Sequence, residues 1–399
     1  MRLLAVHQGG GLGGAPVSLL KLLQALDART FESQAIFSEP GGVLDYAREL
    51  GVQARVVPTG GAFFYSAHAR LGPRSLARFI RTFPPAVRTA QRVLRAQRPD
   101  VLHLNTSVLV AWAAAARREG VPVVWVVREV LGPNPAVRAW HAGFISSRAR
   151  RVVAISQAVR ACFPTSLGER IRVVHNAVDL AEFDLDLLHR ALDVRHELGL
   201  GPHAQVVMAI GSVQRPKGHW LLLDALTRLE GTQLVLVAGG VPPTYADTWR
   251  GRAKRALGRP LDNLDALLRD ARRRGLAERI RVTGFRRDVA RLLAAADVLV
   301  FPSLQPEGFG RPIIEAMAMA RPVVATDVGP SAELLGPAAG RLVPPRPAAL
   351  AAALDELLRS PATRSRMGAA GRERVERCFS LERQAAAMQA IYLGAMPGA

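Results

Sequence analysis

The chain has 399 residues, of which 49% are hydrophobic and 22% charged, as is typical of a globular protein long enough for two domains. No run of about 18 apolar residues is free of charge, which excludes a membrane-spanning helix, and the amino terminus shows no cleavable signal pattern. Two distant cysteines, Cys162 and Cys378, exclude a disulfide framework. We therefore expect a cytoplasmic protein.

The net charge of +20 comes almost entirely from arginine, since lysine occurs only at Lys21, Lys217 and Lys254. A GC-rich coding sequence produces such a composition, so the total charge alone indicates little about partners. Arg70–Arg98 is more informative, because it holds eight arginines, no acidic residue and interleaved apolar side chains. This pattern predicts basic amphipathic helices broken at Pro84-Pro85, which either form a solvated face or contact an anionic membrane. Nucleic-acid binding is disfavoured because no recognition motif accompanies the charge.

Short apolar runs alternate with helical patterns along the whole chain, which predicts parallel sheets wound with helices. The first series of predicted strands covers residues 2–7, 33–38, 53–57, 101–104, 123–127, 152–155 and 171–175. The second series covers residues 206–210, 234–238, 280–283, 298–301, 323–325 and 341–342, with a basic helical insertion at 241–275. We predict two Rossmann-like domains facing a central cleft, residues 1–185 and 186–375, and a carboxyl-terminal helix, 376–399, that packs on the first. Ligands of such sheets bind at the carboxyl ends of strands.

The first predicted strand ends in the glycine loop Gly9–Gly14, which contains a G-x-G-x-x-G pattern, with Glu39 near the end of the second strand. We expect a loop rich in amide donors that faces the cleft. A dinucleotide-binding site, and with it an NAD(P)-dependent oxidoreductase, is an alternative.

Two other predicted strands of the first domain end in polar residues. His103 and Asn105 follow one strand, and Arg128 and Glu129 follow the next. His103 is either a ligand contact at the cleft edge or a structural histidine. The Arg–Glu pair is either a simple ion pair or a group that positions an acceptor or a phosphate.

In the second domain, the first strand runs into Gly211–Gly218, where Arg215 and Lys217 suit a pyrophosphate unless the turn is merely solvated. The chain has no P-loop, which disfavours ATP hydrolysis. Asp184-Leu185-Asp186 has the spacing of a metal-binding Asp-x-Asp, but helical sequence follows it, so we expect a helix start. Without a metal, cations and loop amides must stabilise a leaving diphosphate.

A pair of carboxylates eight residues apart, Glu307 and Glu315, follows the predicted strand 298–301. Glu307 is expected in a loop and Glu315 in the first turn of a helix that Pro312 begins. Between them, Gly308–Gly310 leave backbone amides uncovered at the helix amino terminus, which is a ready anion site. A phosphate cradle flanked by two carboxylates suits a nucleotide-sugar.

These motifs together resemble the GT-B retaining glycosyltransferases of glycosyltransferase family 4, over nearly the whole chain and most strongly from Val206 to Leu342. Asn176-Ala177-Val178-Asp179 and Gly284-Phe285 support the resemblance. In three places the chain departs from the family pattern. The segment 241–275 is longer than the common pattern, which suits a specificity or membrane element. Ser212 stands where arginine is usual, so Arg215 is expected to replace it, and Arg128-Glu129 stands where His-Asp is common.

The resemblance implies a role for each candidate residue. Glu315 would bind the ribose, Glu307 the transferred sugar, and Lys217 with Arg215 the phosphates. The implied donor site comprises Gly14, Gly211, Phe285, Arg286, Gly308, Phe309, Gly310 and Glu315. The implied catalytic residues are Glu307, Arg215 and Lys217, and the implied acceptor residues are His103, Asn105, Arg128 and Glu129.

The resulting hypothesis is a metal-independent hexosyltransferase without a cofactor, whose UDP- or GDP-sugar donor is a substrate. It would transfer the sugar with retention to a sugar or lipid-linked acceptor, in cell-surface polysaccharide, lipopolysaccharide or glycolipid synthesis. Arg70–Arg98 would hold it on the inner face of the cytoplasmic membrane. The alternatives are the oxidoreductase and a basic scaffold or nucleic-acid-binding protein.

Overall fold

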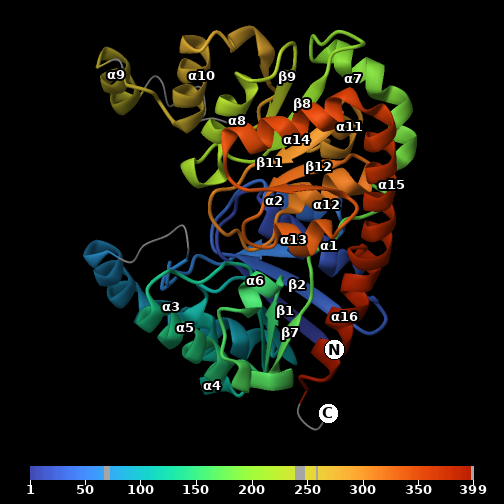
Figure 1. The fold of residues 1–399 in the computed structure, drawn as a ribbon. Helices are drawn as coiled ribbons and strands as arrows, with labels where there is room; N and C mark the ends of the chain where they lie inside the picture. Colours follow the sequence, from blue (N-terminus) through green and yellow to red (C-terminus); the bar gives the residue numbers. More distant parts are fainter. Residues whose placement is uncertain (67–71, 239–247, 258, 397–399) are drawn as a thin grey trace. The chain divides into compact units, whose positions relative to one another are not determined.

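The computed structural model describes residues 1–66, 72–238, 248–257 and 259–396, and the chain forms two compact units (Figure 1). The first unit comprises Met1–Asp179, Pro306–Phe309 and Phe379–Ala399, and the second comprises Leu180–Gln305 and Gly310–Cys378. The chain thus enters the second unit at residue 180, where the predicted boundary is 186, and returns to the first at Pro306–Phe309 and again at Phe379. Of the predicted basic segments, residues 70, 71, 241–247 and 258 lie outside the described ranges.

The first unit contains a seven-stranded parallel sheet in the order β3-β2-β1-β4-β5-β6-β7. Its strands are β1 (Arg2–His7), β2 (Glu32–Phe37), β3 (Gln53–Val56), β4 (Val101–Leu104), β5 (Val123–Val127), β6 (Arg151–Ala154) and β7 (Ile171–Val173). Its helices are α1 (Gly14–Ala25), α2 (Val43–Glu49), α3 (Pro73–Gln97), α4 (Val110–Glu119), α5 (Pro135–Arg148), α6 (Gln157–Arg160), the 3-10 helix η1 (Thr165–Arg170) and α16 (Leu381–Leu393).

The second unit contains a six-stranded parallel sheet in the order β10-β9-β8-β11-β12-β13. Its strands are β8 (Val206–Ile210), β9 (Gln233–Val237), β10 (Ile280–Val282), β11 (Val298–Phe301), β12 (Val323–Thr326) and β13 (Gly340–Val343). Its helices are η2 (Leu185–Arg190), α7 (Ala191–Glu197), η3 (Arg215–Lys217), α8 (His219–Leu226), α9 (Trp249–Ala256), α10 (Asn263–Arg273), η5 (Ala277–Arg279), α11 (Val289–Ala294), α12 (Arg311–Ala318), α13 (Ser331–Leu335), α14 (Pro347–Arg359) and α15 (Pro361–Cys378).

In each sheet the strand order reverses at one point, between β1 and β4 in the first unit and between β8 and β11 in the second. Right-handed crossovers therefore place helices on both faces of each sheet. In the second unit α8 packs against α10 and α14, and α12 packs against α13 and α15. Loops that leave the strand ends in opposite directions open a position for a ligand at the reversal point.

Burial of the apolar strand runs and of the inward stripes of the helices produces the core. In the second unit, Leu222, Leu223 and Leu226 of α8 meet Leu354 and Leu357 of α14 over the sheet, and all five side chains are fully buried. Burying such a side chain contributes about 1.5–3 kcal/mol. The thirteen predicted strands are all present, with ends within two residues of the prediction, so the α/β fold is confirmed.

One prediction about the helices is wrong, because α3 continues through Pro84 and Pro85 instead of breaking there. Each proline removes one helical hydrogen bond and favours a break. Tertiary packing overrides this preference, since Ala86, Val87 and Leu94 are buried in the second half of α3, which packs along α4. Within the described ranges, no helix is both long and apolar enough to cross a membrane.

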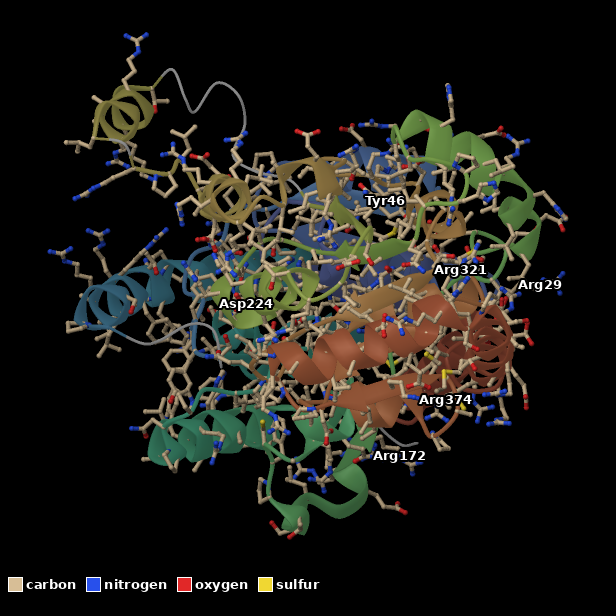
Figure 2. All side chains as sticks on the ribbon, turned by 45° about the horizontal axis from the view of Figure 1, so that its top comes forward. Arg29, Tyr46, Arg172, Asp224, Arg321 and Arg374 are labelled. Carbon is tan, nitrogen blue, oxygen red and sulfur yellow. The ribbon has the colours of Figure 1, made fainter. Side chains whose placement is uncertain are left out.

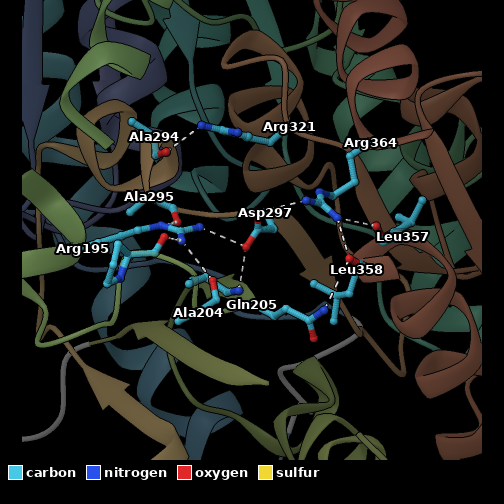
Figure 3. A network of polar contacts seen from close by, with 12 residues as sticks. Arg195, Ala204, Gln205, Ala294, Ala295, Asp297, Arg321, Leu357, Leu358 and Arg364 are labelled. Atoms are coloured by element: carbon cyan, nitrogen blue, oxygen red, sulfur yellow. Dashed lines mark hydrogen bonds and ion pairs between the residues drawn. The ribbon is translucent and has the colours of Figure 1, made fainter. Parts of the chain in front are cut away.

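A carboxylate at the start of β11, Asp297, joins several elements of the second unit (Figure 3). Its Oδ2 accepts hydrogen bonds from Arg195 Nη2 at 3.0 Å and from the backbone N–H of Val206 at 2.8 Å. Its Oδ1 lies 3.6 Å from Arg364 Nη2 of α15. The Asp297 side chain is only 17% exposed, so water replaces these partners poorly.

We expect Asp297→Asn to destabilise the protein by about 2–4 kcal/mol, because it leaves buried guanidinium groups without their carboxylate. Equilibrium unfolding in urea measures the change. Asp355→Asn is the matched control, since the Asp355–Arg359 pair is largely exposed, and should cost less than about 1 kcal/mol. Equal losses for both variants would contradict a structural role for the Asp297 network.

Candidate active site

Two loops of the second unit meet at its reversal point, one after β8 and one after β11. Gly218 has φ +71°, and a Cβ on it would lie 1.8 Å from the carbonyl oxygen of Pro302. The backbone N–H of Leu304 donates to the carbonyl of Pro216 at 2.7 Å. Only glycine permits this approach, so the two loops are fixed to each other.

The turn between Gly211 and Gly218 directs its two cations to different places. Gly211 has φ +131°, and a Cβ on it would lie 3.6 Å from Lys217 Nζ, which places the ammonium at the end of β8. The guanidinium of Arg215 instead lies 3.7 Å from the centroid of the Trp220 ring. The prediction that both cations face one diphosphate is therefore not met in this conformation.

Gly310 and Glu315 form the start of α12 in the second unit. Gly310 has φ +121° at the helix amino terminus, and Pro312 lies in the first turn as predicted. Glu315 is the fifth helical residue, so it projects from the second turn rather than the first. Its carboxylate is nearly buried, and Arg311 Nη2 lies 2.9 Å from its Oε1. This ion pair holds the carboxylate in one orientation.

The loop that carries Glu307 belongs to the first unit. A Cβ on Gly308 would lie 1.9 Å from the carbonyl oxygen of Arg128, and Ser156 Oγ donates to the carbonyl of Gly308 at 2.7 Å. Phe309 is buried beside the ring of Phe379. The carbonyl of Gly308 thus helps to anchor the loop, and Glu307, half-buried, extends from an anchored segment.

Arg128 lies buried at the carboxyl end of β5, with 8% of its surface exposed. Its Nε donates to Asn105 Oδ1 and its Nη1 donates to Asn176 Oδ1, both at 2.7 Å. Ser18 Oγ of α1 also donates to Asn176 Oδ1, at 3.2 Å. No role is predicted from the sequence for Asn176 or Ser18, although the Asn176–Asp179 motif indicates this segment.

His103 is fully buried, so the structure corrects the prediction that it contacts a ligand at the cleft edge. Its Nδ1 lies 2.6 Å from the hydroxyl of Tyr392 on α16, and its Nε2 lies 3.3 Å from Asn105 Oδ1. Burial, together with the charge of Arg128, lowers the pKa of His103 to about 3. The same causes lower the pKa of His7 to about 3, so both rings are neutral at pH 7.

Asn105 is also fully buried and acts as a positioning residue. Its Nδ2 lies 3.0 Å from His7 Nδ1, while its Oδ1 holds Arg128. Glu129 is half-buried, and its Oε2 accepts hydrogen bonds from the backbone N–H groups of Ser107 at 3.0 Å and Arg128 at 3.3 Å. Burial raises the pKa of Glu129, although these bonds oppose the shift.

The glycine loop after β1 is closed by the chain that follows β2. A Cβ on Gly10 would lie 2.3 Å from the carbonyl oxygen of Glu39, and the Gly9 N–H donates to Ser38 Oγ at 2.7 Å. Gly13 is the residue before α1, and Gly14 is its first residue. Glu39 therefore supports the loop through its backbone, while its side chain is exposed.

The loop of Phe285 and Arg286, which the resemblance assigns to the donor site, follows the edge strand β10. Phe285 is 61% exposed, whereas Arg286 is held by Asp288, with Nε–Oδ1 at 2.7 Å, and by Glu197, with Nη1–Oε1 at 2.9 Å. These two carboxylates raise the pKa of Arg286.

The Asp184 side chain accepts a hydrogen bond from the backbone N–H of Asp186 and caps the start of η2, as predicted. Across the described part of the chain, no three His, Cys, Asp or Glu side chains lie close enough together to hold a metal.

The two Rossmann-like units define a GT-B glycosyltransferase fold. HepE from Anabaena, in complex with UDP and glucose, has a TM-score of 0.77 at 22% identity over 98% of this chain and 99% of its own. A glycosyltransferase from Rickettsia africae has the same TM-score at 18% identity over 100% and 99% of the two chains.

The family described as Glycosyltransferase Family 4 matches residues 12–182, and the one described as Glycosyl transferases group 1 matches residues 204–360. D-inositol 3-phosphate glycosyltransferase of Streptomyces scabiei is 30% identical over 98% of this chain and 89% of its own. Alpha-maltose-1-phosphate synthase of Mycobacterium tuberculosis is 30% identical over 81% and 85% of the two chains. The chain belongs to glycosyltransferase family 4. The predicted glycosyltransferase activity is thereby confirmed, and the oxidoreductase alternative finds no support.

We expect Gly218→Ala to destabilise the protein by about 2–4 kcal/mol, because strain at positive φ adds to the overlap with Pro302. Gly231→Ala is a matched control, since Gly231 has φ +67° with nothing within 4 Å of a Cβ, and should cost only about 1 kcal/mol. Chemical denaturation of both variants measures the difference. Equal effects would show that the contact between the two loops is not tight in solution.

Proposed function

We propose that the enzyme transfers a hexose from a nucleoside-diphosphate sugar to an acceptor hydroxyl, with retention of the anomeric configuration, in cell-surface polysaccharide, lipopolysaccharide or glycolipid synthesis. The observation that carries the proposal is the close contact of Gly218, which follows Lys217, with Pro302 in the loop after β11, at the reversal point of the second sheet. The structures of HepE in complex with UDP and with UDP-glucose support a donor of this kind.

On the donor side, Lys217 neutralises the diphosphate, and the amides of Gly308, Phe309 and Gly310 donate to it. Glu315, held by Arg311, accepts hydrogen bonds from the ribose hydroxyls. Glu307 accepts hydrogen bonds from the transferred sugar. The remaining proposed contacts to the donor come from the backbone of Gly14 and of Gly211. The loop that holds Phe285 and Arg286 is a further proposed contact.

In the reaction, the bond between the anomeric carbon and the diphosphate oxygen breaks while the acceptor oxygen bonds to the same face of the sugar. The leaving phosphate oxygen takes the acceptor's proton. Lys217 and the loop amides stabilise the charge of the departing diphosphate. Arg215 contributes only if its guanidinium leaves Trp220.

On the acceptor side, Arg128 and the half-buried Glu129 are the groups proposed to meet the acceptor. His103 and Asn105 hold Arg128 in place rather than touch substrate. Two relatives, D-inositol 3-phosphate glycosyltransferase and alpha-maltose-1-phosphate synthase, are named after phosphorylated compounds. A phosphorylated sugar acceptor is therefore a reasonable first substrate to test, since Arg128 carries a guanidinium suited to phosphate.

Removing the charge of Glu315 and removing that of Glu307 should have different effects on the reaction. We expect Glu315→Gln to weaken donor binding about tenfold or more, because it removes a charged acceptor of ribose hydroxyls. Glu307→Gln should lower kcat with little change in donor affinity, because the sugar contact strengthens in the transition state.

Donor titration by calorimetry and steady-state rates with UDP- and GDP-sugars measure both effects. Glu278→Gln is the control, because Glu278 is exposed in the same unit. Melting temperatures separate loss of fold from loss of binding. Wild-type rates for Glu307→Gln would refute the role of this carboxylate.

We further propose that the first half of α3 rests on an anionic membrane surface. Arg74, Arg78 and Arg81 are exposed there, together with Ile80, which is 62% exposed. The neighbouring Phe63 ring contacts both Phe79 of α3 and the half-exposed Trp140 of α5. Cations beside exposed apolar rings suit the boundary between headgroups and acyl chains.

Replacing Arg74, Arg78 and Arg81 together with glutamine should abolish binding to anionic vesicles and leave activity on a soluble acceptor intact, since about 1 kcal/mol of membrane attraction is lost per charge. Replacing Arg88 and Arg92 in the second half of α3, and Arg98 directly after it, removes the same charge and serves as control. Vesicle co-sedimentation is the measurement. Unchanged binding by the first triple variant would exclude this surface.

A further inference from the structure

A pocket of about 460 Å³ lies in the second unit where η3 and α8 meet α10. Its charged and aromatic lining consists of Arg215, Trp220, Arg269, Asp270, Arg273 and Arg274. The volume falls within the range of small-molecule sites. Lys217, Glu307 and Glu315, the proposed donor residues, do not line it.

The carboxylates around the pocket pair with three of its four arginines. Asp270 is shared by Arg273 at 2.9 Å and Arg274 at 3.1 Å. Asp224 of α8, labelled in Figure 2, also pairs with Arg274. Arg269 pairs with Asp265 at 3.1 Å.

Arg215 is the fourth arginine of the pocket lining. Among the described residues its guanidinium pairs with no carboxylate, and it rests over the Trp220 ring, exposed to solvent. A cation held over an aromatic face is positioned without being neutralised, because the ring attracts it without offering a hydrogen-bond acceptor. The N–H donors of Arg215 therefore remain available to an anion that enters the pocket.

We propose that this pocket binds a phosphate group of a ligand other than the donor diphosphate. A phosphate accepts paired hydrogen bonds from planar guanidinium groups, and the pocket offers that of Arg215, with those of Arg269, Arg273 and Arg274 in the same lining. The phosphate would come from a soluble sugar phosphate or from a lipid headgroup. The distinction from the donor rests on the proposed function, in which Lys217 holds the donor diphosphate.

The 3-10 turn η3 links this pocket to the donor loop, because Arg215 and Lys217 are its first and last residues. An anion on Arg215 and a diphosphate on Lys217 therefore act on the two ends of one turn. Any resulting change in donor affinity must be matched by an equal change in affinity for the pocket ligand.

The test measures binding of inorganic phosphate and of glucose 1-phosphate by calorimetry at constant ionic strength. The pocket variant is Arg269→Gln combined with Arg273→Gln, and Arg272→Gln is the matched control, because Arg272 is exposed on the same helix but does not line the pocket. Lys217→Gln removes the donor-side cation. We expect phosphate affinity to survive Lys217→Gln and Arg272→Gln and to fall about tenfold or more in the pocket variant.

Co-sedimentation with phosphatidylcholine vesicles, with and without phosphatidic acid, identifies the source of the phosphate. Loss of soluble phosphate binding alone assigns a sugar phosphate, and loss of vesicle binding as well assigns a lipid headgroup. Unchanged binding of both ligands by the pocket variant overturns the proposal, as does loss of phosphate binding in Lys217→Gln. Donor turnover by Glu307→Gln at the wild-type rate would instead refute the proposed function and leave the pocket result standing.

Discussion

The contact between Gly218 and the carbonyl oxygen of Pro302 fixes the geometry on which the candidate donor site depends. It brings the loop after β8 against the loop after β11 at the point where the strand order reverses. Lys217 directly precedes this contact, and the loop after Pro302 leads into α12. The close approach of the turn that carries Lys217 to the loop that leads into α12 therefore requires glycine at position 218.

Strand positions were predictable chiefly because the central strands, such as β4, β5, β11 and β12, are short apolar runs buried on both faces. Such a run is visible in the sequence whatever the rest of the chain does. The continuous course of α3 could not be predicted in this way, because it depends on α4, which begins after β4 and packs along the second half of α3. Local preference at Pro84 and Pro85 favours a break, and packing of a distant segment decides otherwise.

The candidate site also has features that could be predicted from the sequence and features that could not. The segments Gly211–Gly218 and Gly308–Gly310 were recognisable, because glycines in the loops that follow strands leave backbone amides uncovered. The burial of His103 depends on Tyr392, which lies 289 residues later in the chain. The residues next to His103 in the sequence do not indicate this contact, so the burial could not be predicted. The guanidinium of Arg215 lies over the ring of Trp220, five positions further on, and this contact was not predicted from the sequence.

The large arginine content has a structural use that composition alone could not reveal. Arginines donate to carbonyl groups at the ends of helices that have no partner within the helix. Arg321 donates to the carbonyls of Leu293 and Ala294 at the end of α11 (Figure 3), and Arg374 (Figure 2) donates to those of Glu333 and Leu334 in α13. Other arginines that donate to carbonyls at or near helix ends are Arg170, Arg279, Arg364 and Arg372.

These arginines act within the fold, and their side chains are partly buried where they donate, so they say little about partners of the protein. The informative cations are those on exposed faces that do not cap a helix, as in the first half of α3 and at Arg215. A charge of +20 is therefore neither a uniform field nor a compositional accident. One part of it closes helix ends, another part pairs with carboxylates, and a third lies on exposed surfaces such as the first half of α3.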